Sequence, residues 1–134
     1  MRFYCTDDTV DLGQYPYHVR DVHISDPFIL ADPKSRCYYT YVQFADTERF
    51  PDVETDKEHG VFYVLESKDL IHWSKPQICF RQNNFWADKD YWAPEVHIWK
   101  GRYYLFSSFR ADGHYRKCQC LVSDSPRSEE RRVG

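Results

Sequence analysis

Short runs of β-branched and aromatic residues, separated by turn-forming residues, recur along the chain. In the first half, residues 27–32 (PFILAD), 37–44 (CYYTYVQF) and 61–67 (VFYVLES) have this character, and residues 33–36 (PKSR) lie between the first two runs. Strands are enriched in β-branched and aromatic residues, whereas Pro and Ser favour turns. Because helical periodicity is nearly absent, the pattern predicts an all-β protein.

The second half of the chain repeats the order of elements in the first half. Residues 94–99 (PEVHIW), 102–109 (RYYLFSSF) and 118–126 (CQCLVSDSP) correspond to the strands upstream, and the tyrosine pairs at 38–39 and 103–104 align with each other. A long acidic loop in the first half accounts for most of the difference in length. A repeat of roughly 60 residues built from antiparallel strands is typical of a propeller blade. A two-unit β-sandwich is the alternative, because repeat length alone does not exclude it.

Composition and charge narrow the function classes. Aromatic residues make up 18% of the 134 residues, and the formal net charge is −3. A mildly acidic chain without a basic block does not favour nucleic-acid binding. Aromatic side chains fill β cores and also stack on flat ligands such as sugar rings, and the composition allows both uses. No secretory signal and no stretch of transmembrane length is visible, so we expect a cytoplasmic protein without a membrane partner.

The sequence offers no pattern for a metal or a cofactor. The chain has five cysteines, an odd number, which argues against a complete disulfide framework. None of them has C-x-x-C spacing, which argues against a zinc knuckle. The six histidines form no H-x-x-x-H pattern, and no Gly-rich phosphate loop or G-x-S-x-G elbow occurs. We therefore expect neither a metal site nor a cofactor.

Two carboxylates stand in similar aromatic surroundings. Asp26 precedes one predicted strand (HISDPFIL), and Glu95 opens another (YWAPEVHIW). Such a pair suggests the acid and the base of a glycosidase. Taken alone, an Asp-Pro pair such as Asp26-Pro27 is more often a turn element than a catalytic one. Aromatic neighbours would desolvate Glu95 and raise its pKa, as a general acid requires, although structural sites also perturb pKa values.

Five segments in fixed order resemble glycoside hydrolase family 43: HISDPFIL, YYTYV, GVFYVLESKDLIHW, YWAPEVHIWKGRYYLFSSF and LVSDSP. The resemblance covers residues from about 18 to 126. It implies a five-bladed β-propeller enzyme that cleaves O-glycosyl bonds of arabinose- or xylose-containing polysaccharides and oligosaccharides with inversion. Residues 1–126 would then form the N-terminal portion of the propeller, with a first blade at about 18–75 and a second at about 85–126.

The resemblance also implies residue roles. Asp26 matches the general base, which deprotonates the attacking water. The general acid of the family is a glutamate on a later blade, so Glu95 is expected to shape the substrate pocket. Trp86, Trp92 and His23 complete the expected substrate-binding residues, with core packing as the alternative for the two tryptophans. Without the general acid, the fragment is expected to be inactive alone.

The last eight residues break the strand pattern. Residues 127–134 (RSEERRVG) lack apolar periodicity and resemble the in-frame translation of a common sequencing-library adapter. The alternative is an ordinary charged tail. We expect a non-native tail and hence a chain truncated after about two blades.

Three other functions remain open at the level of sequence. A non-catalytic carbohydrate-binding propeller would keep the aromatic residues but would not need Asp26. A propeller that binds protein partners would have no affinity for sugars. The sucrose-cleaving group of five-bladed glycosidases typically begins with Asn-Asp-Pro-Asn, and Ser25-Asp26-Pro27-Phe28 departs from that motif.

Overall fold

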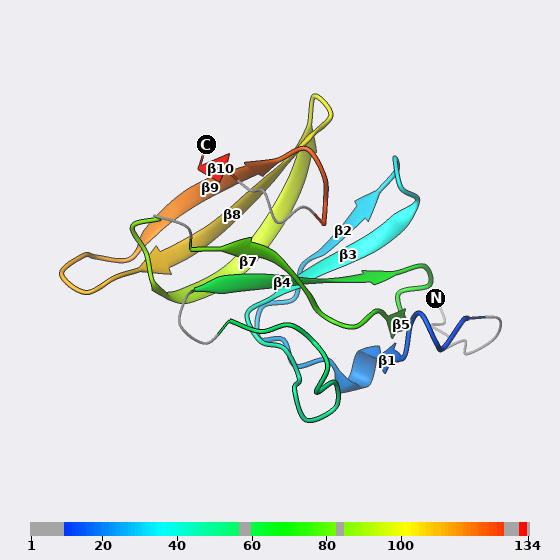
Figure 1. Cartoon of the computed structure of the whole chain (residues 1–134). Coiled ribbons are helices and arrows are strands. Elements are labelled where there is room, and N and C mark those ends of the chain that lie inside the picture. Colours follow the sequence, from blue (N-terminus) through cyan, green and yellow to red (C-terminus); the bar gives the residue numbers. More distant parts are fainter. Residues whose placement is uncertain (1–9, 57–59, 83–84, 128–131, 134) are drawn as a thin grey trace, which may run out of the picture.

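The computed structural model describes residues 10–56, 60–82, 85–127 and 132–133, and these residues form two antiparallel sheets (Figure 1). The first sheet contains β1 (Tyr17–His18), β2 (Ile29–Asp32), β3 (Cys37–Val42), β4 (Val61–Ser67), β5 (His72–Trp73) and β6 (Gln77–Arg81). The second contains β7 (Lys89–Trp99), β8 (Arg102–Arg110), β9 (Lys117–Ser123) and β10 (Arg132–Val133). A 3-10 turn, η1 (Val19–Asp21), follows β1. The all-β prediction is confirmed.

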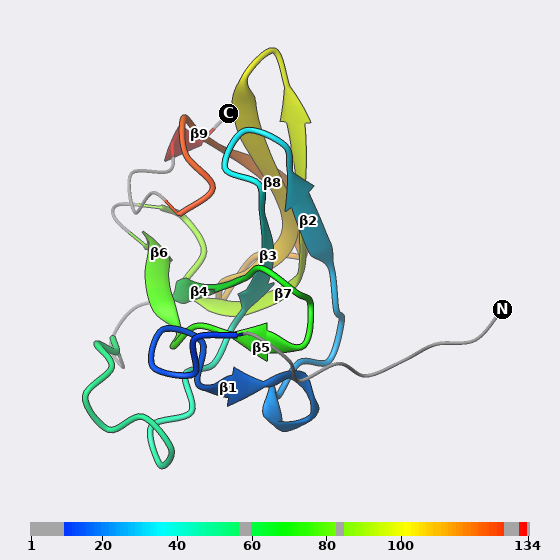
Figure 2. The same cartoon turned by 90° about the vertical axis from the view of Figure 1, so that its right-hand side faces the viewer.

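The first sheet is built on the hairpins β2–β3 and β3–β4. Strand β4 also pairs with β5 and β6, and β5 in turn pairs with β1 near the N-terminus (Figure 2). Strand β6 was not predicted from the sequence. Because of this strand, the first sheet extends to Arg81, beyond the expected end of the first blade at about residue 75. Strand β6 is short and pairs with β4, not with β5, which precedes it in the chain. Pairing between strands that are not consecutive gives no local sequence pattern.

The second sheet has the order β10-β9-β8-β7. Strands β7 and β8 are joined by a tight turn in which Lys100 and Gly101 have φ angles of 48° and 75°. Glycine adopts positive φ without steric cost, which suits this turn. Strand β10 lies in the segment 127–134 that was expected to be a non-native tail, and it pairs with Leu121 and Val122 of β9. Residues 128–131 and 134 of that segment lie outside the described residues.

One cluster of buried side chains runs through both sheets. Tyr39, Tyr41 and Phe62 contribute from the first sheet, and Leu105 and Phe109 contribute from the second. The Tyr41 hydroxyl donates a hydrogen bond to the Pro126 carbonyl at 2.8 Å, which ties the end of the second sheet to the first. Much of the aromatic content therefore serves core packing between the sheets.

A second buried cluster fills the other side of the first sheet, around Tyr17, Phe50 and Trp73. It packs the N-terminal strand and the long β3–β4 connection onto the sheet. Within the described ranges, no helix has the length and apolar character needed to cross a membrane.

Candidate active site

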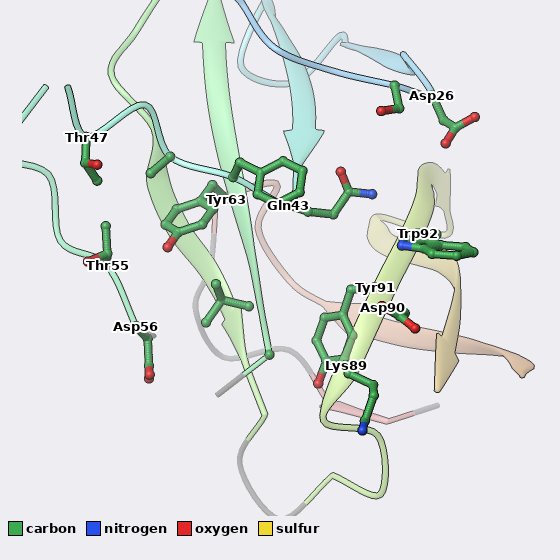
Figure 3. Close-up of a pocket in the computed structure, with 15 residues that line it drawn as sticks. Asp26, Gln43, Thr47, Thr55, Asp56, Tyr63, Lys89, Asp90, Tyr91 and Trp92 are labelled. Carbon is green, nitrogen blue, oxygen red and sulfur yellow. The ribbon is translucent and has the colours of Figure 1, made fainter. Parts of the chain in front are cut away.

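A pocket with a volume of about 660 Å³ lies where the two sheets meet (Figure 3). This volume is within the range typical of ligand sites, roughly 300–1,000 Å³. Three segments supply its walls: the approach to β2, the β3–β4 connection with the start of β4, and the start of β7. The lining residues are Ser25, Asp26, Gln43, Phe44, Ala45, Thr47, Thr55, Asp56, Gly60, Val61, Tyr63, Lys89, Asp90, Tyr91 and Trp92.

Asp26 lies at the rim of this pocket. It is exposed and precedes Pro27, which has no backbone N–H and so cannot join the strand ladder, and β2 begins at Ile29. Figure 3 shows Asp26 and Trp92 on the same side of the pocket, with the amide of Gln43 directed toward them. Among the described residues, the Asp26 carboxylate forms no hydrogen bond or ion pair, so it is available to a ligand.

Trp92 reaches the pocket because β7 is irregular around it. The register of β7 against β8 shifts on both sides of Trp92, and the flanking residues Asp90 and Ala93 have φ angles of 53° and 52°. Such bulges redirect side chains, and positive φ at non-glycine residues marks strained backbone that often accompanies functional sites. The Ser107 hydroxyl donates to the Trp92 carbonyl and holds this segment on β8. Trp92 remains 51% exposed.

The charged residues beside Trp92 are paired with the β8–β9 hairpin. The Lys89 ammonium lies 2.8 Å from the Asp112 carboxylate, and the hydrogen bond from Lys89 to that carboxylate raises the lysine pKa. The Asp90 carboxylate lies 3.5 Å from the guanidinium groups of Arg110 and Arg116. These pairs fix the start of β7, and their three cations and two carboxylates leave a net charge of +1 there.

Tyr91 forms a buried wall of the pocket. Its hydroxyl donates to the Ala87 carbonyl at 2.7 Å, and burial, with a smaller contribution from the charge of Asp88, raises the tyrosine pKa above its usual value. Its ring packs against Phe62 and Phe109 in the core. Tyr91 therefore acts as a neutral structural residue.

The other residues predicted to contact substrate do not line this pocket. Trp86 is half-buried, and its indole N–H donates to the Gln119 side chain at 2.6 Å. Glu95 lies on the exposed face of the second sheet, where its carboxylate is 3.0 Å from the His97 ring. Substrate contact by either residue stays a prediction.

His23 lines a second, smaller cavity of about 330 Å³ on the other side of the β3–β4 connection. Tyr17, Asp46 and Glu48 lie in the same cavity, and Phe44, Ala45 and Thr47 line both cavities. The connection is thus the wall between His23 and the pocket that contains Asp26. Within the part of the chain that the structure describes, no group of three or more His, Cys, Asp or Glu side chains is placed to hold a metal ion.

Sequence reasoning missed Gln43, Phe44 and Asp90 as pocket residues. The first two follow β3 at the start of the acidic connection, where Phe44 is 69% exposed. A large aromatic residue directly before a polar insertion can be recognised in the sequence, and this pattern could have pointed to Phe44. Asp90 gave no such pattern, because its placement depends on the bulges in β7.

Two antiparallel sheets of this kind, joined by a shared core, are consecutive blades of a five-bladed β-propeller of the glycosidase type. Residues 18–129 match the model of glycosyl hydrolases family 43, and the chain belongs to this family. The match confirms the resemblance noted in the sequence and disfavours a β-sandwich. A search of curated proteins found no match.

Solved structures agree with this assignment. An endo-arabinase from Bacteroides thetaiotaomicron VPI-5482 is 34% identical, with a TM-score of 0.69, over 85% of this chain and 36% of that chain. A GH43 β-xylosidase/α-arabinofuranosidase from a compost microbial metagenome, in complex with xylotriose, is 17% identical, with a TM-score of 0.61, over 81% and 33% of the two chains. The native arabinanase of Bacillus subtilis is 20% identical, with a TM-score of 0.53, over 76% and 33%. The chain spans about a third of the length of these structures.

Proposed function

We propose that the protein containing these residues hydrolyses O-glycosyl bonds in arabinose- or xylose-containing polysaccharides or oligosaccharides with inversion, and that Asp26 is the general base. The observation that carries this proposal is the position of Asp26, an exposed carboxylate with no ion pair among the described residues, in a pocket beside the exposed indole of Trp92. An aromatic ring next to a carboxylate offers a sugar both an apolar contact and a proton acceptor. Family membership and the similarity to an endo-arabinase support the substrate class.

The proposed chemistry is a single displacement. Asp26 accepts a proton from a water molecule as the water oxygen attacks the anomeric carbon from the face opposite the leaving group. The glycosidic C–O bond breaks, and a general acid donates a proton to the departing oxygen. Inversion requires the two carboxyl groups to lie roughly 6.5–9.5 Å apart so that the water fits between base and sugar.

We place the general acid outside these 134 residues, on a part of the propeller that this chain does not span. The other pocket carboxylates, Asp56 and Asp90, already form ion pairs with arginine side chains. Glu95 points to the exposed sheet face and pairs with His97, which does not favour it as the partner of Asp26. The chain alone is therefore expected to bind sugar without cleaving it.

The test is the Asp26→Asn variant in a protein with the complete propeller, assayed on arabino- and xylo-oligosaccharides. Loss of a general base should lower kcat on the order of 10²–10⁴-fold while ligand binding persists. Asp124→Asn, an exposed carboxylate paired with Arg102, is the matched control and should leave kcat unchanged. Unchanged hydrolysis by Asp26→Asn would exclude the base role.

A non-catalytic carbohydrate-binding module is the second candidate, and the exposed Trp92 is the observation that favours it. This candidate predicts that the complete propeller binds oligosaccharides, that no hydrolysis occurs in the unaltered protein, and that Asp26→Asn binds as tightly as the unaltered protein.

A further inference from the structure

Trp92 is covered on one face by an arginine from another strand pair. The central carbon of the Arg116 guanidinium lies 3.7 Å from the centroid of the Trp92 ring, which is the distance of direct stacking. Arg116 comes from the β8–β9 connection and does not line the pocket, whereas Trp92 does. The indole therefore has one face on the guanidinium, lines the pocket and remains half-exposed.

The guanidinium is itself held in place. One terminal nitrogen donates to the Asp90 carbonyl at 2.8 Å and to the Ser108 hydroxyl at 3.0 Å. The other terminal nitrogen lies 3.5 Å from the Asp90 carboxylate, and the Arg116 side chain is 28% exposed. A planar guanidinium can stack on a ring and donate hydrogen bonds in its own plane at the same time, which a lysine cannot do.

The backbone around Trp92 is irregular, although Trp92 itself pairs with Ser108 of β8. The ladder between β7 and β8 is interrupted on both sides of Trp92, so regular strand pairing does not fix the direction of its side chain. Arg116 binds the Asp90 carbonyl, two residues before Trp92, and stacks on the ring itself. It thus ties both the backbone and the ring of this segment to the second sheet.

We propose that Arg116 is a positioning residue that holds Trp92 as a one-faced platform for a sugar ring next to Asp26. The proposal rests on the proposed function, since it takes the ligand of the pocket to be a pentose-containing glycan. An indole that is already ordered loses less conformational entropy on binding than a mobile one, and therefore binds more tightly. Arg116 acts through Trp92 and does not itself touch the ligand.

The chain offers a matched control for this role. Arg110 lies at the same distance of 3.5 Å from the Asp90 carboxylate as Arg116 does. Among the described residues, the structure shows a ring contact with Trp92 for Arg116, whereas the ion-pair partner of the Arg110 side chain is Asp90. Arg110→Gln thus removes a positive charge from Asp90 and keeps the stacked guanidinium, whereas Arg116→Gln removes both.

The first measurement uses the ligand-free 134-residue chain and the ¹H–¹⁵N spectrum of its indole groups. The Trp92 indole signal is assigned by its loss in Trp92→Phe. We expect Arg116→Gln to shift and broaden this signal, Arg116→Lys to do so partly, and Arg110→Gln to leave it in place. An unchanged Trp92 signal in both Arg116 variants would overturn the proposal. If Arg116→Gln does not fold, as judged by circular dichroism, Arg116→Lys decides.

The second measurement is the Kd of a linear arabino-oligosaccharide, with a xylo-oligosaccharide as the second ligand. Arg116→Gln should raise the Kd about 3- to 10-fold, the size expected from losing a stacked cation and an ordered ring. In the Trp92→Phe background the same substitution should have a smaller effect, because the two residues act as a unit. An equal effect in both backgrounds would show that Arg116 does not act through Trp92.

The two proposals fail in different ways. If the unaltered chain binds neither oligosaccharide, the glycan platform and the proposed ligand class are both rejected. The ligand-free spectrum then still decides whether Arg116 orders Trp92. If the chain binds oligosaccharide but Arg116→Gln binds it equally well, the positioning role alone is rejected.

Discussion

The Tyr103 hydroxyl on β8 donates a hydrogen bond to the Asp32 carboxylate at the end of β2, over 3.0 Å. Both side chains are buried, and the bond joins the two sheets away from the pocket. Asp32 also accepts hydrogen bonds from the backbone N–H groups of Lys34 and Ser35 and from the Ser35 hydroxyl. Burial, together with the hydrogen bond to Asp32, raises the pKa of Tyr103 to about 12, so the hydroxyl stays a neutral donor.

Removing this hydroxyl should weaken the contact between the sheets. We expect Tyr103→Phe to lower the free energy of unfolding by about 1–3 kcal/mol, because a buried carboxylate loses one of its donors. Urea unfolding of the chain measures the change. Tyr104→Phe, at the neighbouring position of β8 and on its other face, should cost less. Equal effects of the two substitutions would contradict a specific role for the bond.

The turn between β4 and β5 contains a carboxylate that makes the stability of the fold decrease at low pH. The Asp69 carboxylate lies 2.7 Å from the His72 ring and accepts hydrogen bonds from the backbone N–H groups of Ile71 and His72. Burial alone would raise the pKa of Asp69, but the hydrogen bonds outweigh it and hold the pKa at about 2, below the ordinary 3.8. Because the folded-state pKa is the lower one, the ionised group stabilises the fold above pH 4 and loses this effect as the pH falls toward 2.

We therefore expect Asp69→Asn to remove about 2 kcal/mol of stability at neutral pH and to flatten the loss of stability between pH 4 and pH 2. Thermal unfolding across this pH range measures both effects. Asp52→Asn is the control, because Asp52 is an exposed carboxylate paired with Lys75 and its ion pair is screened by solvent. If the two variants show the same acid dependence, the Asp69 interpretation is wrong.

Gly60 lies against the ring of Tyr91 at the base of the pocket. A Cβ atom at Gly60 would approach the Tyr91 hydroxyl oxygen to 2.6 Å, which a buried tyrosine cannot relieve by a simple rotation. We expect Gly60→Ala to destabilise the chain by about 1–3 kcal/mol and to weaken oligosaccharide binding, because both residues line the pocket. Calorimetry measures both quantities.

Gly13→Ala is the milder comparison, since its Cβ would meet only the exposed side chain of Asp11, at 3.1 Å. A Gly60→Ala variant as stable as Gly13→Ala would mean that Tyr91 moves freely, against the packing seen here.

The two tryptophans predicted to contact substrate should behave differently. Trp92→Ala is expected to weaken oligosaccharide binding about tenfold, the loss expected for one stacked aromatic contact. Trp86→Ala should leave the Kd nearly unchanged and lower stability, because Trp86 bonds Gln119 and packs on Phe85. Fluorescence titration and thermal unfolding separate these effects. The reverse result would move the binding site to Trp86.

The sequence predicted the strands better than the site. Runs such as CYYTYV and RYYLFSSF are dense in aromatic residues, and their pairing with chain neighbours made β3 and β8 predictable. Strand β6 was missed because its partner β4 is reached only after the chain passes through β5. Long-range pairing of this kind has no local pattern.

The sequence pointed to Asp26 because Asp-Pro before a strand is part of a motif, and the structure places Asp26 at the pocket while its catalytic role stays a prediction. Trp92 was proposed from its aromatic setting and its substrate contact stays a prediction; it lies between two register shifts of β7 and stacks on Arg116, none of which strand periodicity predicts. Glu95 has a similar aromatic setting in the sequence, but the structure places it on the exposed face of the second sheet beside His97.

The buried cluster shared by the two sheets has a consequence for how the chain opens. Phe62 of β4 and Phe109 of β8 stack edge to face across the boundary, so neither sheet keeps its core if the other separates. Local opening of one sheet alone would expose apolar surface from both. Backbone amides of β4 and β8 should therefore exchange with deuterium at a common slow rate, as a single cooperative unit rather than as two modules.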